Sequence, residues 1–477
     1  MRSGLLAVLL LLINITAEAQ YLYGRVTQKY PPGEIKKDIA QLYGDLKKYH
    51  LNLNRFITAA ELKEAFDSIQ NTVSDSLTAQ QLHYRLLPLL SRIGDGHLTF
   101  NYFDPAKITA ADKAEYTADY DSPFEQLQLK FIGKRIFVKD CIAEGKRIPA
   151  GAEVVSINGM GSGAVIDKAL QYTFADGYNT TFKYFFLNYK PLDGLWTNVF
   201  RVCKTLHVVY RSGNAMDSVT IQGKRKRNAL RPSDSAVVNR LPFLDFKRID
   251  TGTAYLKINT FEPAWDSTDR QTFARLSKEL GQARHLILDL RGNTGGQMGL
   301  MLMMLRGMIT QSIQPIKFPA ELTKGVLLPP RDTAKRNQLR YVKEYNIQGW
   351  GNLVPFNGAY KNPLYVLING GTFSAATTMA YALAIDKRAV LIGEETGGGR
   401  NTITAGIMYN NRMKYTGISY SFGLVPFNAT YPAAETGHGV QPDIKINYTV
   451  DDYLNNRDLE MERALQLIEM ETSNLKV

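Results

Sequence analysis

The feature that most constrains the fold is a set of short, continuous apolar segments in the second half of the chain. They lie at residues 285–290, 364–368 and 389–393, and a glycine-rich loop follows each of the first two. Apolar runs of this length, bounded by turns, are typical of strands buried on both faces of a parallel sheet. Helical patterns at 266–282 and 375–385 alternate with these strands. The alternation predicts an α/β domain over residues 243–450, and a C-terminal helix is expected over 451–477.

The first hundred residues follow a different pattern. Between residues 34 and 93 apolar side chains recur at helical spacing, and Thr58-x-x-Glu61 and Thr78-x-x-Gln81 have the form of capping boxes. Pro88 is expected to kink or end the third of these helices. We therefore predict a small N-terminal helical bundle over residues 20–105.

Residues 124–222 are patterned as short strands separated by turns. The sequence IPAGAEVVSING at 148–159 combines a tight turn, a β-branched strand and an Asn-Gly turn, and a helical run follows at 164–172. This order resembles the carboxylate-binding core of a PDZ domain, a module that binds extended peptides by strand addition. The alternative is a β-rich packing module that binds nothing, because residues 173–205 have the character of an atypical insertion.

The N-terminus has the pattern of an export signal. Arg2 precedes an apolar segment at 5–13 and an A-x-A cleavage site at 17–19. We expect residues 1–19 to be a signal peptide and the protein to be periplasmic or extracellular. The alternative, an N-terminal membrane anchor, is less favoured because so short a segment cannot span a bilayer of about 30 Å. No later segment is apolar enough for a stable membrane span.

Charge and cysteine content exclude several classes of function. The net charge is +12, but the densest basic run, at 224–227, lacks interleaved aromatic residues and is expected to be a solvated connector, so no nucleic-acid partner is predicted. Cys141 and Cys203 are too few for a disulfide framework, although an oxidising compartment would permit one bond between them. No cysteine–histidine cluster has zinc-ligand spacing, and no glycine motif has phosphate-loop spacing, so neither metal nor cofactor is expected.

The first candidate for chemistry is a serine at the start of a predicted helix. Ser374 ends the loop NGGTFS at 369–374 and precedes the helical run from 375. A helix start supplies free N–H groups and positive potential, which stabilise an oxyanion beside the hydroxyl. Taken alone, however, the position is better explained as an ordinary N-cap serine.

Four motifs in a fixed order change that interpretation. HLILDLRGNTGG, YVLINGGTFSAATTMAYAL, VLIGEETGGG and GHGVQPDI together resemble the tail-specific (C-terminal processing) and tricorn-like serine peptidases. The helical module ending in GDGHLTF and the PDZ-like insert also match that family's layout. The resemblance implies a multidomain α/β protein with a crotonase-like peptidase domain. It implies Ser374 as nucleophile, with Gly295 or Gly296 and Ala375 supplying oxyanion N–H groups.

The resemblance also bears on the catalytic base. Members with a Ser–Lys dyad carry GEKTFGKG, and the position of the second lysine is Gly399 here. Arg400 cannot replace that lysine, because a guanidinium does not release its proton near neutral pH. The tricorn-like branch uses a histidine from the N-terminal side, which corresponds to His97 in GDGHLTF. A neutral imidazole suits the role, since its ordinary pKa of about 6.5 allows it to accept the serine proton.

The third member of the site is open at this stage. Glu435 lies where tricorn-like enzymes place a glutamate shortly before GVxPD, with an offset one residue longer, and a solvent-facing loop residue is an equal alternative. Asp95 could orient the imidazole instead, or cap its own turn. His438, on the same loop as Glu435, is a rival base.

These features together predict an exported serine peptidase acting on proteins or peptides by acyl-enzyme chemistry, either directed at C-termini or of general envelope specificity. An inactive member that only binds peptides or ligands, and an esterase-type acyl hydrolase at the same site, are the alternatives. Residues 311–362 show little periodicity and are expected to form a long surface loop or lid.

Overall fold

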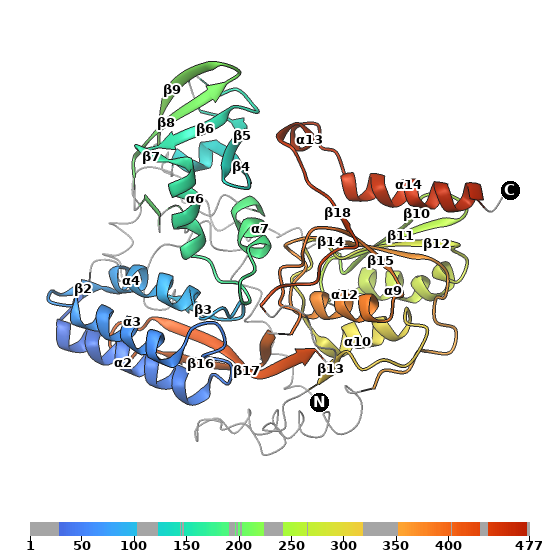
Figure 1. Cartoon of the computed structure of the whole chain (residues 1–477), viewed down its shortest axis with the longest axis horizontal. Coiled ribbons are helices and arrows are strands. Elements are labelled where there is room, and N and C mark those ends of the chain that lie inside the picture. The colour runs from blue at the N-terminus through green and yellow to red at the C-terminus, as the bar shows by residue number, and fades with distance from the viewer. Residues whose placement is uncertain are drawn as a thin grey trace.

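In the computed structural model the described residues are 28–102, 123–143, 145, 147–189, 196, 199–200, 203–223, 242–264, 266–317, 352–401, 403–429 and 437–474. They form helices and four sheets (Figure 1). The predicted signal peptide at 1–19, the basic run at 224–227, Glu435 and most of the predicted lid lie outside the described residues. Among those described, no helix combines the length and apolar character needed to cross a membrane.

A six-stranded sheet organises the second half of the chain, as the apolar segments predicted. β10 (Leu244–Arg248) pairs antiparallel with β11 (Thr253–Ile258). The other strands run parallel to β11 in the order β12 (His285–Asp289), β14 (Leu364–Ile368), β15 (Val390–Gly393) and β18 (Ile444–Lys445). Every residue of β12 and β14 is buried, which explains why their sequences are continuously apolar.

Helices cover both faces of this sheet (Figure 1). Leu286, Leu288 and Val366 pack toward α9 (Ser267–Leu280), α10 (Met298–Arg306) and α12 (Ala375–Ile385). The alternate residues Ile287 and Leu367 pack toward α14 (Leu459–Asn474), which follows the short α13 (Val450–Leu454). Because parallel strands end at one edge, the loops after β12 and β14 lie together there, and the start of α12 lies with them.

The N-terminal module contains α2 (Pro32–Tyr49), α3 (Ala59–Asn71) and α4 (Ala79–Ser91), with β1 (Lys29–Tyr30) paired to β2 (Leu77–Thr78). Both predicted capping boxes are present, at the starts of α3 and α4. Pro88 does not end α4, which continues to Ser91. A proline this close to the end removes a single backbone hydrogen bond, and the buried leucines around it hold the last turn in place.

The helical module completes its core with strands from the far end of the chain. β16 (Ile403–Arg412) and β17 (Ser419–Ala429) form a long hairpin, and β17 also pairs with β3 (Thr99–Asn101) and β13 (Ile316–Lys317). Apolar residues of α2, α3, α4 and this hairpin form one cluster. The N-terminal unit is therefore a helix-on-sheet domain rather than a bundle of helices alone.

The middle of the chain is a PDZ-like module, as predicted. Its sheet contains β4 (Leu127–Ile132), β5 (Arg135–Cys141), β6 (Glu153–Ile157), β7 (Met160–Gly161), β8 (Thr205–Ser212) and β9 (Ala215–Gln222), after a short 3₁₀ helix at Pro123–Gln126. α6 (Ser162–Gln171) packs on it through Val165, Ile166 and Ala169. Asn158 and Gly159 both have positive φ, as a tight Asn-Gly hairpin turn requires. Cys141 and Cys203 are both free thiols.

One further helix lies between the PDZ-like module and the central sheet (Figure 1). α7 (Thr181–Tyr189) belongs to the segment that resembled an insertion. Its Asn188 amide accepts the Phe131 N–H (2.8 Å) and donates to the Phe131 carbonyl (2.9 Å), which pairs it with the edge of β4. A side chain at Gly371 would meet the Phe185 ring at 2.4 Å, so α7 also packs closely on the loop after β14.

Candidate active site

Ser374 stands at the N-terminus of α12 in a backbone conformation that is rare for a residue with a side chain. Its φ is 55° and its ψ is −121°, and its side chain makes no capping hydrogen bond to the helix. Such a conformation costs about 1–3 kcal/mol and occurs mainly at functional sites. Ser374 occupies the N-cap position, but its hydroxyl does not cap the helix, so the interpretation as an ordinary N-cap serine is wrong.

The Ser374 hydroxyl instead meets His97. The imidazole Nε2 lies 3.1 Å from Oγ, although the two residues are 277 positions apart in the sequence. This separation is within the range for direct proton transfer. His97 comes from the loop between α4 and β3, and the pairing of β3 with β17 fixes that loop against the rest of the molecule. The structure thus brings together the two residues that the family motifs singled out.

Aromatic packing holds the imidazole ring. The Phe373 ring lies 4.7 Å from the His97 ring between centroids, and Phe182 of α7 stacks on Phe373 at 4.1 Å with an interplanar angle of 8°. A side chain at Gly96 would meet the Phe373 ring at 2.8 Å, so glycine is needed beside His97 for this approach. The residue preceding the serine therefore helps to place its partner.

The predicted oxyanion donors divide into two roles. The Gly295 N–H donates to Asn293 Oδ1 at 2.9 Å and is therefore engaged within its own loop. A Cβ at Gly295 would lie 2.7 Å from the Ser374 Cβ, so this glycine allows the two loops to approach. Within the described part of the chain, the Gly296 and Ala375 N–H groups have no acceptor. Of the three predicted donors, these two therefore keep an N–H without an acceptor among the described residues.

Two other candidates from the sequence have hydrogen-bond partners other than the serine hydroxyl. The Gly399 N–H, at the position of the absent lysine, donates to Asp176 Oδ2 (2.9 Å). His438 Nδ1 lies 3.3 Å from Glu395 Oε1, so this imidazole is engaged with another loop rather than with Ser374. Glu435 lies outside the described residues, so its role stays a prediction.

Asp95 is committed to other partners than the His97 ring. Its Oδ1 accepts the backbone N–H of His97 at 2.8 Å, and its Oδ2 lies 2.9 Å from His50 Nε2. Within the described residues, His97 Nδ1 is buried and has no hydrogen-bond partner. Asp95 therefore fixes the loop that carries His97 but makes no hydrogen bond to the imidazole.

A second carboxylate, which the sequence did not single out, lies beside His97. Asp176 is fully buried, and its Oδ1 accepts the Gly96 N–H at 2.8 Å. Burial is the main cause that raises the pKa of Asp176 to about 6; the charge of His97 opposes the rise and that of Asp95 adds to it. Asp176 is followed by Gly177 in the apparent insertion, and an Asp-Gly pair in an apparent loop indicates only a turn.

Asp95, His97 and Asp176 also have the residue types that hold a metal ion, and their donor atoms lie within 4.8 Å of one another. All four oxygens of the two carboxylates already take part in hydrogen bonds to protein groups. The two carboxylates therefore form a hydrogen-bonded network around the imidazole, in which His97 Nδ1 is the atom without a partner among the described residues.

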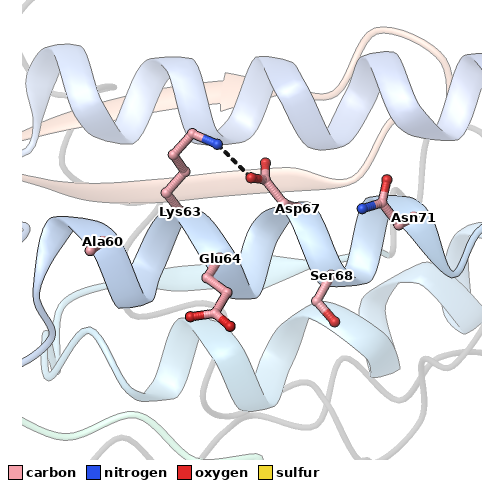
Figure 2. Close-up of a pocket in the computed structure, with 6 residues that line it drawn as sticks. All are labelled: Ala60, Lys63, Glu64, Asp67, Ser68 and Asn71. Carbon is pink, nitrogen blue, oxygen red and sulfur yellow. Dashed lines mark hydrogen bonds and ion pairs between the residues drawn. The ribbon is translucent and has the colours of Figure 1, made fainter.

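One hollow on the described surface lies away from the Ser374 loop. It runs along α3 and is lined by Ala60, Lys63, Glu64, Asp67, Ser68 and Asn71 (Figure 2). Its Lys63–Asp67 ion pair is solvent-exposed, and the hollow contains no nucleophile paired with a base. The Ser374 loop is therefore the candidate site.

Comparison with known proteins agrees with this geometry. The sequence profile of peptidase family S41 matches residues 252–446, which include the loops after β12 and β14 and the start of α12. The chain carries a peptidase family S41 domain. Carboxyl-terminal-processing peptidase 2 of the Arabidopsis thaliana chloroplast is 32% identical over 144 residues. That match covers 30% of this chain and 23% of the Arabidopsis protein, so it concerns less than a quarter of the relative's length.

Solved structures extend the likeness to the whole fold. The crystal structure of mature CPAF has a TM-score of 0.60 at 16% identity, over 89% of this chain and 96% of that chain. CPAF complexed with lactacystin has a TM-score of 0.61 at 15% identity, over 89% and 97%. The S41 domain, the PDZ-like module and the N-terminal module therefore share one arrangement with these structures. The predicted multidomain α/β fold is confirmed.

Proposed function

We propose that the chain is an exported serine peptidase that hydrolyses peptide bonds through an acyl-enzyme on Ser374. The observation that carries the proposal is the 3.1 Å contact between His97 Nε2 and Ser374 Oγ in an S41 domain. The positive φ of Ser374 and the absence of a capping hydrogen bond also support the proposal. A serine that only capped the helix would make that bond and would have no need of a strained backbone.

The mechanism follows from the placement of these groups. His97 Nε2 takes the hydroxyl proton as Ser374 Oγ bonds to the carbonyl carbon, and the carbonyl oxygen becomes an oxyanion bound by the Gly296 and Ala375 N–H groups. The imidazolium then gives its proton to the departing amine as the peptide C–N bond breaks. Water, deprotonated by His97, attacks the ester, and Ser374 recovers its proton as the acid leaves.

The proposed reaction requires one particular tautomer of His97. Nε2 must be unprotonated to accept from Ser374, so the ring proton lies on Nδ1, which is buried beside Asp95 and Asp176. These carboxylates favour a positively charged imidazole through their negative charge. The number of protons on the ring therefore alternates between one and two during the reaction.

For the substrate we propose protein or peptide chains, with preference for a free C-terminus. The support is the PDZ-like module, whose domain class captures terminal carboxylates, and the name of the Arabidopsis relative, a carboxyl-terminal-processing peptidase. An esterase-type activity would arise from the same groups. A panel of matched peptides with free and amidated C-termini, together with a simple aryl ester, separates these cases.

The test uses the purified chain, Ser374→Ala and His97→Gln. Peptide hydrolysis by the wild type that disappears in Ser374→Ala is the expected result, with faster cleavage of the free-carboxylate peptides. Ester hydrolysis without peptide hydrolysis would support the esterase instead. Peptide binding by both wild type and Ser374→Ala, with no turnover of any substrate, would establish a binding-only protein.

Export is a separate part of the proposal and rests on residues 1–19. Expression of the full chain in a bacterial host should give a processed protein in the periplasmic fraction. Mass spectrometry of that protein should place its first residue at Gln20. Full-length protein retained in the cytoplasmic fraction would contradict it.

A further inference from the structure

Asp176 occupies the point where three loops meet. The segment 176–179 lies between α6 and α7, and it donates hydrogen bonds to three other loops: Gly177 N–H to Gly94 O (2.9 Å), Tyr178 N–H to Gly437 O (2.8 Å) and Asn179 Nδ2 to Thr396 O (2.8 Å). A side chain at Gly177 would lie 2.5 Å from the Gly437 backbone, so the segments are in direct contact. The loop carrying His97 is thus held to the S41 domain through this segment.

The Asp176 carboxylate makes the central link of this junction. One oxygen accepts the N–H of Gly96, the residue before His97, and the other accepts the N–H of Gly399. Gly399 is the position at which Ser–Lys relatives carry their base. In this chain the backbone N–H at that position binds the Asp176 carboxylate, which lies beside His97. An asparagine could not serve both N–H groups, because its amide nitrogen would face one of them.

The two charged side chains that act on the Asp176 carboxylate lie on one loop, between α4 and β3. His97 and Asp95 both lie on the loop after α4, and Asp95 is itself bonded to His50. The Gly399 loop contributes a backbone N–H, and Phe373 packs against Gly96 with an apolar ring. His97 is therefore the one basic group acting directly on the Asp176 charge among the described residues.

We propose that Asp176 is a positioning residue for the His97–Ser374 pair, which holds the His97 loop in place and supplies the negative charge that favours the imidazolium. The inference rests on the proposed serine-peptidase function. When His97 takes the Ser374 proton, the ionised Asp176 stabilises the resulting positive charge from its buried position. Glu435, which the family resemblance suggested as the orienting carboxylate, lies outside the described residues and remains a separate prediction.

This role has a specific dependence on pH. Burial and Asp95 raise the pKa of Asp176 to about 6, so its charge is present above that pH and is lost below it. The benefit to Ser374 reactivity should disappear over the same range. A merely structural carboxylate would change reactivity by one factor at every pH.

The test measures the rate at which an alkyl fluorophosphonate labels Ser374 in wild type and Asp176→Asn. We expect the variant to label on the order of 100-fold more slowly near pH 8, as for the loss of a unit charge about 5 Å away. Near pH 5 about a tenth of Asp176 is ionised, so the ratio should fall to roughly tenfold. Asp167→Asn is the matched control, because Asp167 is an exposed α6 residue paired with Lys134, and it should label like the wild type.

A second variant keeps the test decisive if Asp176→Asn does not fold. Asp95→Asn removes the neighbouring negative charge that helps to raise the pKa of Asp176. The loss of labelling toward acid pH should therefore occur at lower pH in this variant than in the wild type. The inference is overturned if labelling of Asp95→Asn and of the wild type falls at the same pH. It is also overturned if the ratio of the wild-type labelling rate to that of Asp176→Asn is constant with pH. Wild type that shows no Ser374-dependent labelling overturns the proposed function, and the inference with it.

Discussion

Replacing Gly295 with alanine tests the close approach of the two loops at the site. Gly295 has φ of 102°, a conformation that residues with a side chain rarely adopt. Its new Cβ would lie 2.7 Å from the Ser374 Cβ, 3.0 Å from the Phe373 carbonyl oxygen and 3.1 Å from the Ala375 nitrogen. Two of these neighbours are backbone atoms, which cannot turn aside as a flexible side chain can.

The expected cost combines strain and overpacking. The positive φ contributes about 1–2 kcal/mol, and the clash contributes about 1–3 kcal/mol more. We therefore expect Gly295→Ala to lower the free energy of unfolding by about 3 kcal/mol, and to slow Ser374 labelling at least about tenfold by displacing the serine. The matched control is Gly299→Ala in α10, where a Cβ meets no atom within 4 Å.

Urea unfolding followed by tryptophan fluorescence gives the free energies, and fluorophosphonate labelling of the folded protein gives the reactivity. The control should be as stable as the wild type or slightly more so, by up to about 1 kcal/mol, because alanine favours a helix. Wild-type stability and labelling in Gly295→Ala would refute the approach of the two loops described above.

Three further changes have defined outcomes. Because the pKa of Asp176 is raised to about 6, its contribution to stability is present at low pH and is lost as the pH rises through 6. Between pH 4 and 7 the free energy of unfolding of Asp176→Asn should therefore rise relative to that of the wild type by about 3 kcal/mol. Arg291→Ala removes the guanidinium that pairs with the buried Asp289 and Glu460 and leaves Asp289 with the more distant Lys257, at 3.8 Å, so urea titration should show a loss of about 3 kcal/mol. The exposed Arg457→Ala should leave the midpoint nearly unchanged. Asn188→Ala removes both hydrogen bonds to Phe131, so hydrogen exchange at the Phe131 amide should become faster and stability should fall by about 1–2 kcal/mol. These predictions would be contradicted by an unchanged pH dependence of stability in Asp176→Asn, an unchanged urea midpoint in Arg291→Ala, or an unchanged exchange rate of the Phe131 amide in Asn188→Ala.

Local sequence patterns were sufficient for the buried inner strands of the central sheet, but not for β10 and β18 at its two edges. β12 and β14 are short strands buried on both faces, and a continuous apolar sequence between turns is characteristic of such strands. The capping boxes at Thr58 and Thr78 similarly depend on residues three positions apart. Ser374 and His97 needed more than local pattern, because each alone is compatible with a cap or a turn, and the family motifs supplied the link.

The parts that the sequence did not predict depend on long-range contacts. The hairpin of β16 and β17 joins the N-terminal helices, and Asp38 on α2 accepts the backbone N–H of Thr416 across that interface. Asp176 became a candidate only because its carboxylate binds the N–H groups of Gly96 and Gly399, which lie on loops far away in the sequence. The residues around Asp176 in its own segment do not indicate these contacts. Neither relationship has a periodicity or a short-range spacing that a single sequence could show.

The central claim is that Ser374 is a nucleophile activated by His97, and intact-mass analysis after incubation with a fluorophosphonate tests it most directly. We predict one adduct on the wild type, mapped by peptide mass spectrometry to Ser374, none on Ser374→Ala, and labelling of His97→Gln slower by at least about 100-fold. An adduct that persists in Ser374→Ala, or wild-type labelling of His97→Gln, would contradict it.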